Sequence, residues 1–372
     1  MEEHYAPGLE GIIAGETAIS TVTEGLRYRG YAVEELAAES TFIEVAYLLL
    51  NGELPTQEQL ADFEAVLDES SESIAEVCDL LSQLPVHTPV MDVMRTGISL
   101  TAHFDPHLED HNPDSEMNKA LHLLAIIPLM LAFWHRHTQG LTLGELDPER
   151  SYAANLLTLL TGKVPTSLEE KALDVSLILY AEHEFNASTF TARVVASTGS
   201  DLYSAIVAAV GALKGPLHGG ANEQVLAVLE EVGSADKAEQ WIRTALQKKR
   251  RVMGFGHRVY KTCDPRAVYL KDYCKQLAER RGNFELENMA ETIEQLIWQE
   301  KKLPPNLDWP SARLYHYLGL DVSIYTPLFV VSRVVGWSAH VIEQMRQNRL
   351  IRPSSRYVGP PLRSYVPLSD RG

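Results

Sequence analysis

The sequence predicts a mainly α-helical protein with a small β-hairpin near its N-terminus. Helix-capping patterns recur along the 372 residues, whereas strand-like patterns are mostly confined to the N-terminal region. No internal repeat, low-complexity tract or flexible linker divides the chain. A chain of this length can bury a large core and form more than one domain. Its hydrophobic share of 45% and charged share of 22% are those of an ordinary globular protein.

The first elements expected along the chain are two short strands, residues 18–22 and 26–28, which would pair as a hairpin. A capping box at Thr41-Phe42-Ile43-Glu44 then predicts a helix that runs to Leu50. The Asn51-Gly52 pair is a typical helix stop, because asparagine and glycine tolerate the left-handed conformation that follows a helix.

A second capping pattern, Thr56-Gln57-Glu58-Gln59, predicts the next helix. The apolar residues expected on its buried face are Leu60, Phe63, Val66 and Leu67. The most apolar run of the chain, Ala120 to Trp134, is shorter than a membrane span and predicts a buried helix.

Two later helices are expected to begin where a polar residue precedes proline. Asp264-Pro265 predicts a helix through Leu277, and Thr326-Pro327 predicts a long helix that ends near Arg349. Proline suits the first helical position because the N–H that it lacks would have no partner there. The remaining expected helices are 151–160, 168–182, 202–213, 222–231, 235–248 and 286–299.

The charge of the chain is acidic overall but unevenly distributed. The net charge of −17 argues against nucleic acid or an anionic membrane as the main partner. Residues 243–266 nevertheless hold eight basic side chains against one acidic one, and residues 333–363 hold six arginines against one acidic side chain. These two islands suggest a local anionic ligand, the alternative being solvated helix faces.

The N-terminus and the cysteines predict a cytoplasmic protein. Met1-Glu2-Glu3 is acidic and no apolar stretch of a secretory signal follows it. Cys78, Cys263 and Cys274 are few, odd in number and without Cys-x-x-Cys spacing. Such a set fits a reducing compartment and argues against a disulfide framework or a zinc module.

Two histidines in glycine-rich turns are the strongest chemical signal. His218 lies within residues 215–220 and His257 within residues 254–260. Glycines allow a substrate to approach the backbone closely, and histidine exchanges a proton near neutral pH. Asp308 follows later in the chain. Together the three predict a site that polarises one carbonyl, stabilises another and removes a proton.

Other motif classes do not fit. Gly254-x-Gly256 lacks the third glycine of a dinucleotide fingerprint and follows a helical pattern. His183-Glu184 lacks the second histidine of a zinc-protease motif. His103, His107 and His111 are spaced by four, but prolines interrupt the segment and predict a solvated loop rather than a metal site. We therefore expect neither a metal nor a cofactor.

The motifs, taken in order, resemble those of citrate synthases over nearly the whole chain. The segments that carry the resemblance are 8–11, 183–190, 215–220, 254–266 and 352–359. The resemblance implies a two-domain helical fold with a large domain from residues 1–219 and 320–372. Residues 220–319 would form the small domain between them, and the C-terminal arm would reach a partner subunit. The glycine turns at 215–220 and 254–256 are candidate hinges for domain closure.

The resemblance also implies a role for each candidate residue. His257 would polarise the ketone of oxaloacetate, Asp308 would take a proton from the methyl group of acetyl-CoA, and His218 would hydrogen-bond the thioester oxygen. The residues implied to hold the substrate carboxylates are His183, Arg266, Arg333 and Arg352. The last of these would serve the neighbouring subunit's site, so a homodimer is expected. The residues expected to face CoA phosphates are Lys248, Lys249, Arg250, Arg251, Arg258 and Lys261.

The activity that we expect is citrate synthesis from acetyl-CoA, oxaloacetate and water, the first step of the tricarboxylic acid cycle. The segment Asn306-Leu307-Asp308-Trp309 also resembles relatives that make 2-methylcitrate from propionyl-CoA, so that alternative stays open. A non-catalytic helical scaffold with the same fold is the alternative of another class. It predicts the loss of His218, His257 or Asp308, and all three are present.

Overall fold

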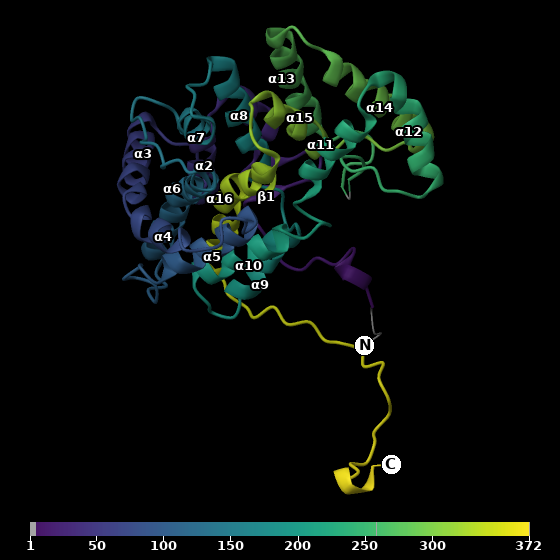
Figure 1. Cartoon of the computed structure of the whole chain (residues 1–372). Helices are drawn as coiled ribbons and strands as arrows, with labels where there is room; N and C mark the ends of the chain where they lie inside the picture. The colour runs from purple at the N-terminus through teal and green to yellow at the C-terminus, as the bar shows by residue number, and fades with distance from the viewer. Residues whose placement is uncertain (1–4, 258, 372) are drawn as a thin grey trace.

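The computed structural model describes residues 5–257 and 259–371. These residues form 16 α-helices and one small three-stranded sheet, which confirms the mainly α-helical fold (Figure 1). The long helix α16 (Tyr325–Arg346) lies at the centre, where it packs against helices from many earlier parts of the chain. The core is therefore assembled around one apolar helix that is buried along most of its length.

The expected N-terminal hairpin is present, with a strand added. Strands β1 (Ser20–Thr21) and β2 (Arg27–Tyr28) pair antiparallel, and β3 (Tyr31–Ala32) extends the sheet from β2. Arg29 and Gly30 join β2 to β3 with φ of +50° and +95°. A two-residue turn with both φ values positive matches the twist of a hairpin. Strand β3 was not predicted from the sequence, because arginine is unusual at such a position.

The capping boxes predicted in the first helices are confirmed. Thr41 caps α2 (Phe42–Asn51), where its side chain and that of Glu44 bond each other's backbone N–H groups at 3.3 and 2.8 Å. Helix α3 (Gln57–Ser71) begins with the same arrangement. Val66 is 38% exposed, so its placement on the buried face of α3 was wrong. The helices not predicted in this region are α1 (Val33–Glu39), α4 (Ile74–Leu81) and α5 (Val90–Ala102).

The most apolar run forms part of a buried helix, as expected. It lies within α6 (Pro113–His137), whose residues from Leu123 to Ala132 are all buried. Helix α6 and the segment Val322–Arg346 are long and apolar enough to cross a membrane by length and composition, yet most of each lies inside the fold. Protein rather than lipid covers their apolar faces, as in core helices.

Three of the next four helices follow the predicted ranges closely: α7 (Tyr152–Thr161), α8 (Ser167–Tyr180) and α10 (Leu202–Leu213). Helix α9 (Ala187–Ala196) was not predicted. Helices α8, α9 and α10 pack against α16. The predicted start and end of α16 were wrong. The helix begins at Tyr325, one residue before Thr326, and ends at Arg346 rather than near Arg349. The hydroxyl of Thr326 does not cap the helix because it donates to the carboxylate of Glu223.

Five further helices pack on one another at one side of the molecule (Figure 1). They are α11 (Ala221–Val232), α12 (Ala235–Gln247), α13 (Pro265–Arg281), α14 (Glu285–Lys301) and α15 (Asp308–Tyr317). Asp264 caps α13 as expected, because its side chain accepts from the backbone N–H of Arg266. The group falls within residues 220–319, and its division from the rest as a separate domain stays a prediction.

The chain after α16 leaves the helical body. Figure 1 shows an extended segment that runs away from the helices and ends in a short 3-10 turn, Leu368–Asp370. Residues 352–371 are exposed. Among the residues that the structure describes, this segment does not pack into the hydrophobic core.

Candidate active site

His218 lies in the turn between α10 and α11, with its ring half-buried. Its Nε2 accepts a hydrogen bond from the backbone N–H of Ser188 at 3.3 Å, and the Ser188 hydroxyl oxygen lies 2.8 Å away. A backbone N–H can only donate, so Nε2 of the neutral ring must be the acceptor and Nδ1 carries the proton. Gly219 is required beside it because a Cβ there would clash with the Leu213 carbonyl oxygen.

The hydrogen bonds of His257 place its ring proton on the other nitrogen, Nε2 rather than Nδ1. The backbone N–H groups of Val259 and Tyr260 donate to its Nδ1 at 3.1 and 3.2 Å. The proton of the neutral ring is therefore on Nε2, and that N–H is the group available to a ligand. Each histidine thus presents one N–H, and the backbone decides which nitrogen carries it.

Both imidazoles are uncharged at neutral pH. Burial, together with the charge of the nearby Arg333, lowers the pKa of His218 to about 4. Burial likewise lowers the pKa of His257 to about 4, with Arg266 acting in the same direction. A neutral imidazole can polarise a carbonyl oxygen by donation without surrendering a proton. The pair is suited to stabilising developing negative charge.

Asp308 is the first residue of α15, and Tyr180 at the end of α8 contacts it directly. The Tyr180 hydroxyl donates to Asp308 Oδ1 at 2.9 Å. Burial raises the pKa of Asp308 to about 6, while the Tyr180 hydrogen bond and the charge of Arg266 hold it lower than burial alone would. The carboxylate is therefore a stronger base than an exposed aspartate and still ionised at pH 7.

The turn that carries His257 and the loop that precedes Asp308 are joined by hydrogen bonds. Asn306 donates from its backbone to the Gly254 carbonyl at 2.9 Å and from its side chain to the Gly256 carbonyl at 3.0 Å. Its side-chain oxygen accepts from the backbone N–H of Asp308 at 3.1 Å. Asn306 therefore fixes the position of the aspartate relative to the histidine turn.

Gly254 makes this junction possible. Its φ is +85°, and a Cβ at this position would lie 2.9 Å from the Trp309 ring. The Trp309 indole is fully buried and packs against the ring of Phe255 at 4.6 Å. Only glycine combines this backbone conformation with so close an approach.

Three of the residues predicted to hold carboxylates, His183, Arg266 and Arg333, are buried. His183 is 9% exposed, and its Nε2 is buried without a partner among the described residues. Arg266 forms two parallel hydrogen bonds with Asp264, at 3.0 and 2.9 Å. Arg333 donates from Nε to the Tyr180 carbonyl at 2.6 Å. No carboxylate among the described residues forms a direct ion pair with Arg333, which favours an anionic ligand there.

The structure brings the three predicted catalytic residues and three of the four predicted carboxylate-binding residues together. The rings of His183 and His257 lie 5.1 Å apart. Arg333 lowers the pKa of both His183 and His218, and Arg266 lowers the pKa of His183 and His257. Segments more than 100 residues apart in the chain therefore share one electrostatic environment.

Several contacts of the site were not predicted from sequence. Tyr180 links Asp308 to the Arg333 guanidinium, and the ring of Phe329 lies 4.6 Å from that of Tyr180 and 6.2 Å from that of His218. Ser188 orients His218. No local pattern marks these residues, since each acquires its role from a partner distant in sequence.

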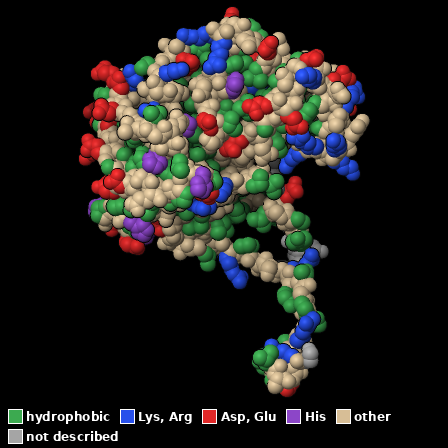
Figure 2. All heavy atoms as spheres, in the orientation of Figure 1, with side chains coloured by type: hydrophobic (Ala, Val, Ile, Leu, Met, Phe, Trp, Pro, Cys, Tyr) green, Lys and Arg blue, Asp and Glu red, His purple; other side chains and the backbone are tan. Residues whose placement is uncertain are grey.

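The structure does not bring Arg352 to this cluster, because it lies in the exposed segment after α16. The cationic residues predicted to face CoA are exposed: Lys248, Lys249, Arg250, Arg251 and Lys261. Figure 2 shows lysine and arginine side chains gathered along the edge of the α11–α15 group. Arg250 is already engaged, with both Nη atoms donating to the carboxylate of Glu231 at 2.8 and 2.7 Å. Arg258 lies outside the described residues.

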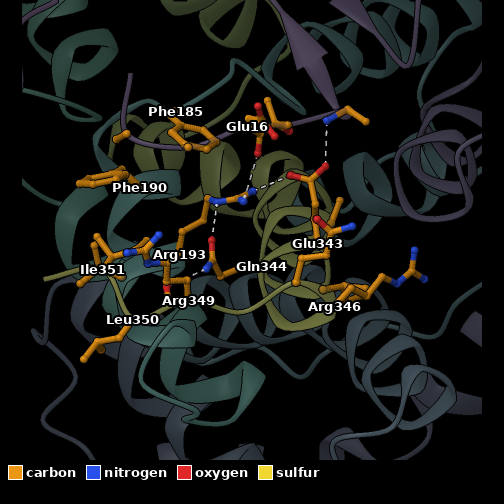
Figure 3. Close-up of a pocket in the computed structure, with 18 of the residues that line it drawn as sticks. Glu16, Phe185, Phe190, Arg193, Glu343, Gln344, Arg346, Arg349, Leu350 and Ile351 are labelled. Carbon is orange, nitrogen blue, oxygen red and sulfur yellow. Dashed lines mark hydrogen bonds and ion pairs between the residues drawn. The ribbon is translucent and has the colours of Figure 1, made fainter. Parts of the chain in front are cut away.

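A separate cavity of about 1250 Å³ lies between the N-terminal segment and the end of α16. In Figure 3, Arg193 extends among Glu16, Glu343 and Gln344, and its guanidinium carbon lies 4.6 Å from the centre of the Phe185 ring. Arg193 also donates to His340 at 2.9 Å, and His340 contacts the carboxylate of Glu182 at 2.9 Å. The wall of this cavity is thus connected to the residue that precedes His183.

The three histidines of the loop after α5 do not form a metal site. His103, His107 and His111 are exposed, and the last two pair with Asp110 and Glu116. Across residues 5–257 and 259–371, no group of three or more His, Cys, Asp or Glu side chains is arranged to hold a metal ion.

Comparison with known proteins identifies a family. The model of the protein family described as "Citrate synthase, C-terminal domain" matches residues 8–354. The citrate synthase of Mycolicibacterium smegmatis is 44% identical, covering 96% of each chain. The 2-methylcitrate synthase of Shewanella oneidensis is 43% identical over 98% of this chain and 97% of its own. The ternary complex of Thermoplasma acidophilum citrate synthase with carboxymethyl coenzyme A and oxaloacetate superposes with a TM-score of 0.93 at 35% identity, covering 99% of this chain and 100% of the other.

Proposed function

The chain belongs to the citrate synthase family of condensing acyltransferases, and we propose that it converts acetyl-CoA, oxaloacetate and water to citrate and CoA. The observation that carries this proposal is the pair of neutral histidines, each left with one N–H to donate, beside an aspartate of raised pKa. Condensation needs two polarised carbonyls and one base, which is what these three residues supply. We infer that the reaction is the entry step of the tricarboxylic acid cycle.

Asp308 begins the reaction as the base. A thioester methyl group is a very weak acid, so a carboxylate alone removes its proton slowly. The Nδ1–H of His218 donates to the thioester oxygen and stabilises the enolate that forms. Removing one such donor typically costs about 3 kcal/mol of transition-state stabilisation.

His257 and the buried cations prepare the second substrate. The Nε2–H of His257 donates to the ketone oxygen of oxaloacetate and makes the ketone carbon electrophilic. His183, Arg266 and Arg333 hold the two carboxylates. Arginine suits this role because its planar fork forms two parallel hydrogen bonds with a carboxylate. Local cations also overcome the repulsion between an acidic protein and anionic substrates.

The new carbon–carbon bond joins the enolate carbon to the ketone carbon. The ketone oxygen takes up one proton, which balances the proton removed from the methyl group, and citryl-CoA results. Water then cleaves the thioester, which releases citrate and CoA and balances the reaction. Water must stay out during enolisation and enter afterwards, so we infer a closure of the α11–α15 group over the site. The glycine turns at 215–220 and 254–256 are the hinges in this proposal.

We also propose a homodimer in which Arg352 completes the site of the partner subunit. The exposed segment after α16 and the open cavity beside it support this proposal, because both present apolar and cationic side chains that the chain itself leaves uncovered. The CoA phosphates are proposed to meet Lys248, Lys249, Arg251, Arg258 and Lys261. Arg250 would contribute only after leaving Glu231.

The acyl group is the point at which two functions compete. Relatives of similar identity are named for citrate and for 2-methylcitrate. One extra methylene is worth about 1–3 kcal/mol of discrimination and depends on the shape of the acyl pocket. The decisive experiment measures thiol release from acetyl-CoA and propionyl-CoA side by side, with and without oxaloacetate. Faster turnover of acetyl-CoA supports the proposal, equal or faster turnover of propionyl-CoA favours 2-methylcitrate synthesis, and no turnover of either contradicts both.

A further inference from the structure

Tyr260 has a buried polar group that none of the interactions above explains. Its hydroxyl oxygen is inaccessible to solvent and has no hydrogen-bond partner within the described part of the chain. Burial raises the pKa of this phenol to about 12, so it keeps its proton at neutral pH. An unpaired buried hydroxyl is unfavourable and calls for a reason.

The surroundings of Tyr260 indicate what could pair with that hydroxyl. The ring stacks on His257 with centroids 4.8 Å apart, meets His183 edge-on at 5.7 Å, and lies 5.6 Å from the Arg266 guanidinium carbon. All three neighbours are proposed to bind or polarise oxaloacetate. Nε2 of His183 is a second buried atom without a partner in the same cluster.

An unpaired hydroxyl alone does not identify a binding residue. Tyr325, the first residue of α16, is also fully buried, and its hydroxyl has no partner among the described residues. Its ring packs against that of Tyr315 in α15. Tyr260 differs because its hydroxyl belongs to a cluster that holds a second unpaired polar atom and a buried cation. Two such atoms in one cationic cluster are the arrangement that a small anionic ligand satisfies.

We propose that Tyr260 is a further substrate-binding residue, whose hydroxyl donates a hydrogen bond to the α-keto dicarboxylate held by His183 and Arg266. This inference rests on the proposed function for the identity of the ligand. Tyr260 would then act twice, since its backbone N–H also donates to Nδ1 of His257 and so leaves the ring proton on Nε2. The phenylalanine variant removes only the hydroxyl and keeps both the ring and the backbone contact.

The test compares Tyr260→Phe with the matched control Tyr325→Phe by titrating oxaloacetate calorimetrically into the full-length protein without CoA. A lost hydrogen bond to a charged group should weaken binding about tenfold or more for Tyr260→Phe. Binding by Tyr325→Phe should stay within about twofold of wild type. The melting temperature of each ligand-free variant should not fall, because each loses an unpaired buried hydroxyl.

Steady-state kinetics provide a second readout. In Tyr260→Phe the KM for oxaloacetate should rise by a larger factor than kcat falls, because the lost contact serves binding. Oxaloacetate binding by Tyr260→Phe within twofold of wild type would overturn the inference. Wild-type protein that binds oxaloacetate but releases no thiol would refute the proposed condensation alone. Wild-type protein that binds no oxaloacetate would overturn both.

Discussion

The hydroxyl of Tyr180 donates a 2.9 Å hydrogen bond to Oδ1 of Asp308. Tyr180 ends α8 and Asp308 begins α15, so one contact joins the central helices to the α11–α15 group. The hydroxyl stabilises the ionised carboxylate, and burial opposes it by favouring the protonated form. The balance between these effects sets the pH range in which the proposed base is available.

Replacing Tyr180 with phenylalanine should shift the acid limb of the kcat profile to higher pH. In wild type we expect kcat to rise as Asp308 ionises near its pKa of about 6. Loss of a hydrogen bond to the ionised form raises that pKa, so the variant needs a higher pH to reach the same fractional activity. The measurement is kcat between pH 5 and 8 at saturating substrates.

The control for this experiment is Tyr203→Phe. The Tyr203 hydroxyl also donates to an aspartate, Asp105, at 2.9 Å, but neither residue belongs to the candidate site. The acid limb of this control should coincide with that of wild type. An unshifted limb in Tyr180→Phe would show that the hydroxyl does not tune Asp308.

Replacing Asp308 with asparagine should lower kcat by about two to four orders of magnitude, the usual worth of a general base. The amide keeps the size and much of the hydrogen bonding of the carboxylate but cannot accept the methyl proton. Oxaloacetate should still bind, because its proposed ligands are His183, His257, Arg266 and Arg333. The checks are single-turnover kinetics and oxaloacetate titration, and a kcat within tenfold of wild type would exclude Asp308 as the base.

Arg352 can be tested by mixing inactive subunits. If Arg352 serves the partner's site, Arg352→Ala and His257→Ala homodimers should both be nearly inactive. Equal mixing and re-association should then restore about a quarter of wild-type activity. Half of the dimers are mixed, and each mixed dimer contains one fully intact site. Activity that stays at background after mixed dimers are demonstrated by mass spectrometry would argue against a shared site.

Gly254→Ala should reduce both stability and activity. The positive φ costs a non-glycine residue about 1 kcal/mol, and the clash of the new Cβ with Trp309 adds about 1–3 kcal/mol. Because Asn306 bonds the Gly254 carbonyl, the shift should also displace Asp308. We expect a lower melting temperature together with a lower kcat.

Gly282→Ala isolates the backbone component of that effect. Gly282 has a similar positive φ of +63° but nothing within 4 Å of an added Cβ, and it lies at the end of α13. It should lose stability modestly and keep its activity. Equal effects of the two substitutions would show that the contact with Trp309 is unimportant.

Much of the fold could be predicted because its signals are local. A capping box depends on four consecutive residues, so α2 was predicted with both its start and its stop. The same reasoning failed at Thr326, where the hydroxyl bonds Glu223 of α11 and the helix begins at Tyr325, two residues before Pro327. A tertiary contact outweighed a local preference there, and no pattern in the sequence contains it.

In the candidate site too, some features could be predicted from local sequence and others depend on tertiary contacts. His218 and His257 could be singled out because glycines flank both of them in the sequence, and Asp308 gained weight only beside these two histidines. The sequence could not reveal that the backbone leaves Nδ1 of His218 and Nε2 of His257 as the donors. Nor could it reveal Tyr180 and Tyr260, whose neighbours in the chain carry no sign of the partners that they meet.

The sequence by itself determined the mainly α-helical fold, since capping and periodicity are patterns of a few consecutive residues. It also determined the candidate histidines, which glycine turns mark, and the aspartate considered with them. The tertiary structure alone decided the protonation, orientation and grouping of those residues. A pKa depends on burial and on charges within a few ångströms, and here these come from α8, α15 and α16. Segments distant in the chain become neighbours only when the core around α16 forms, so their chemistry is a property of packing rather than of local sequence.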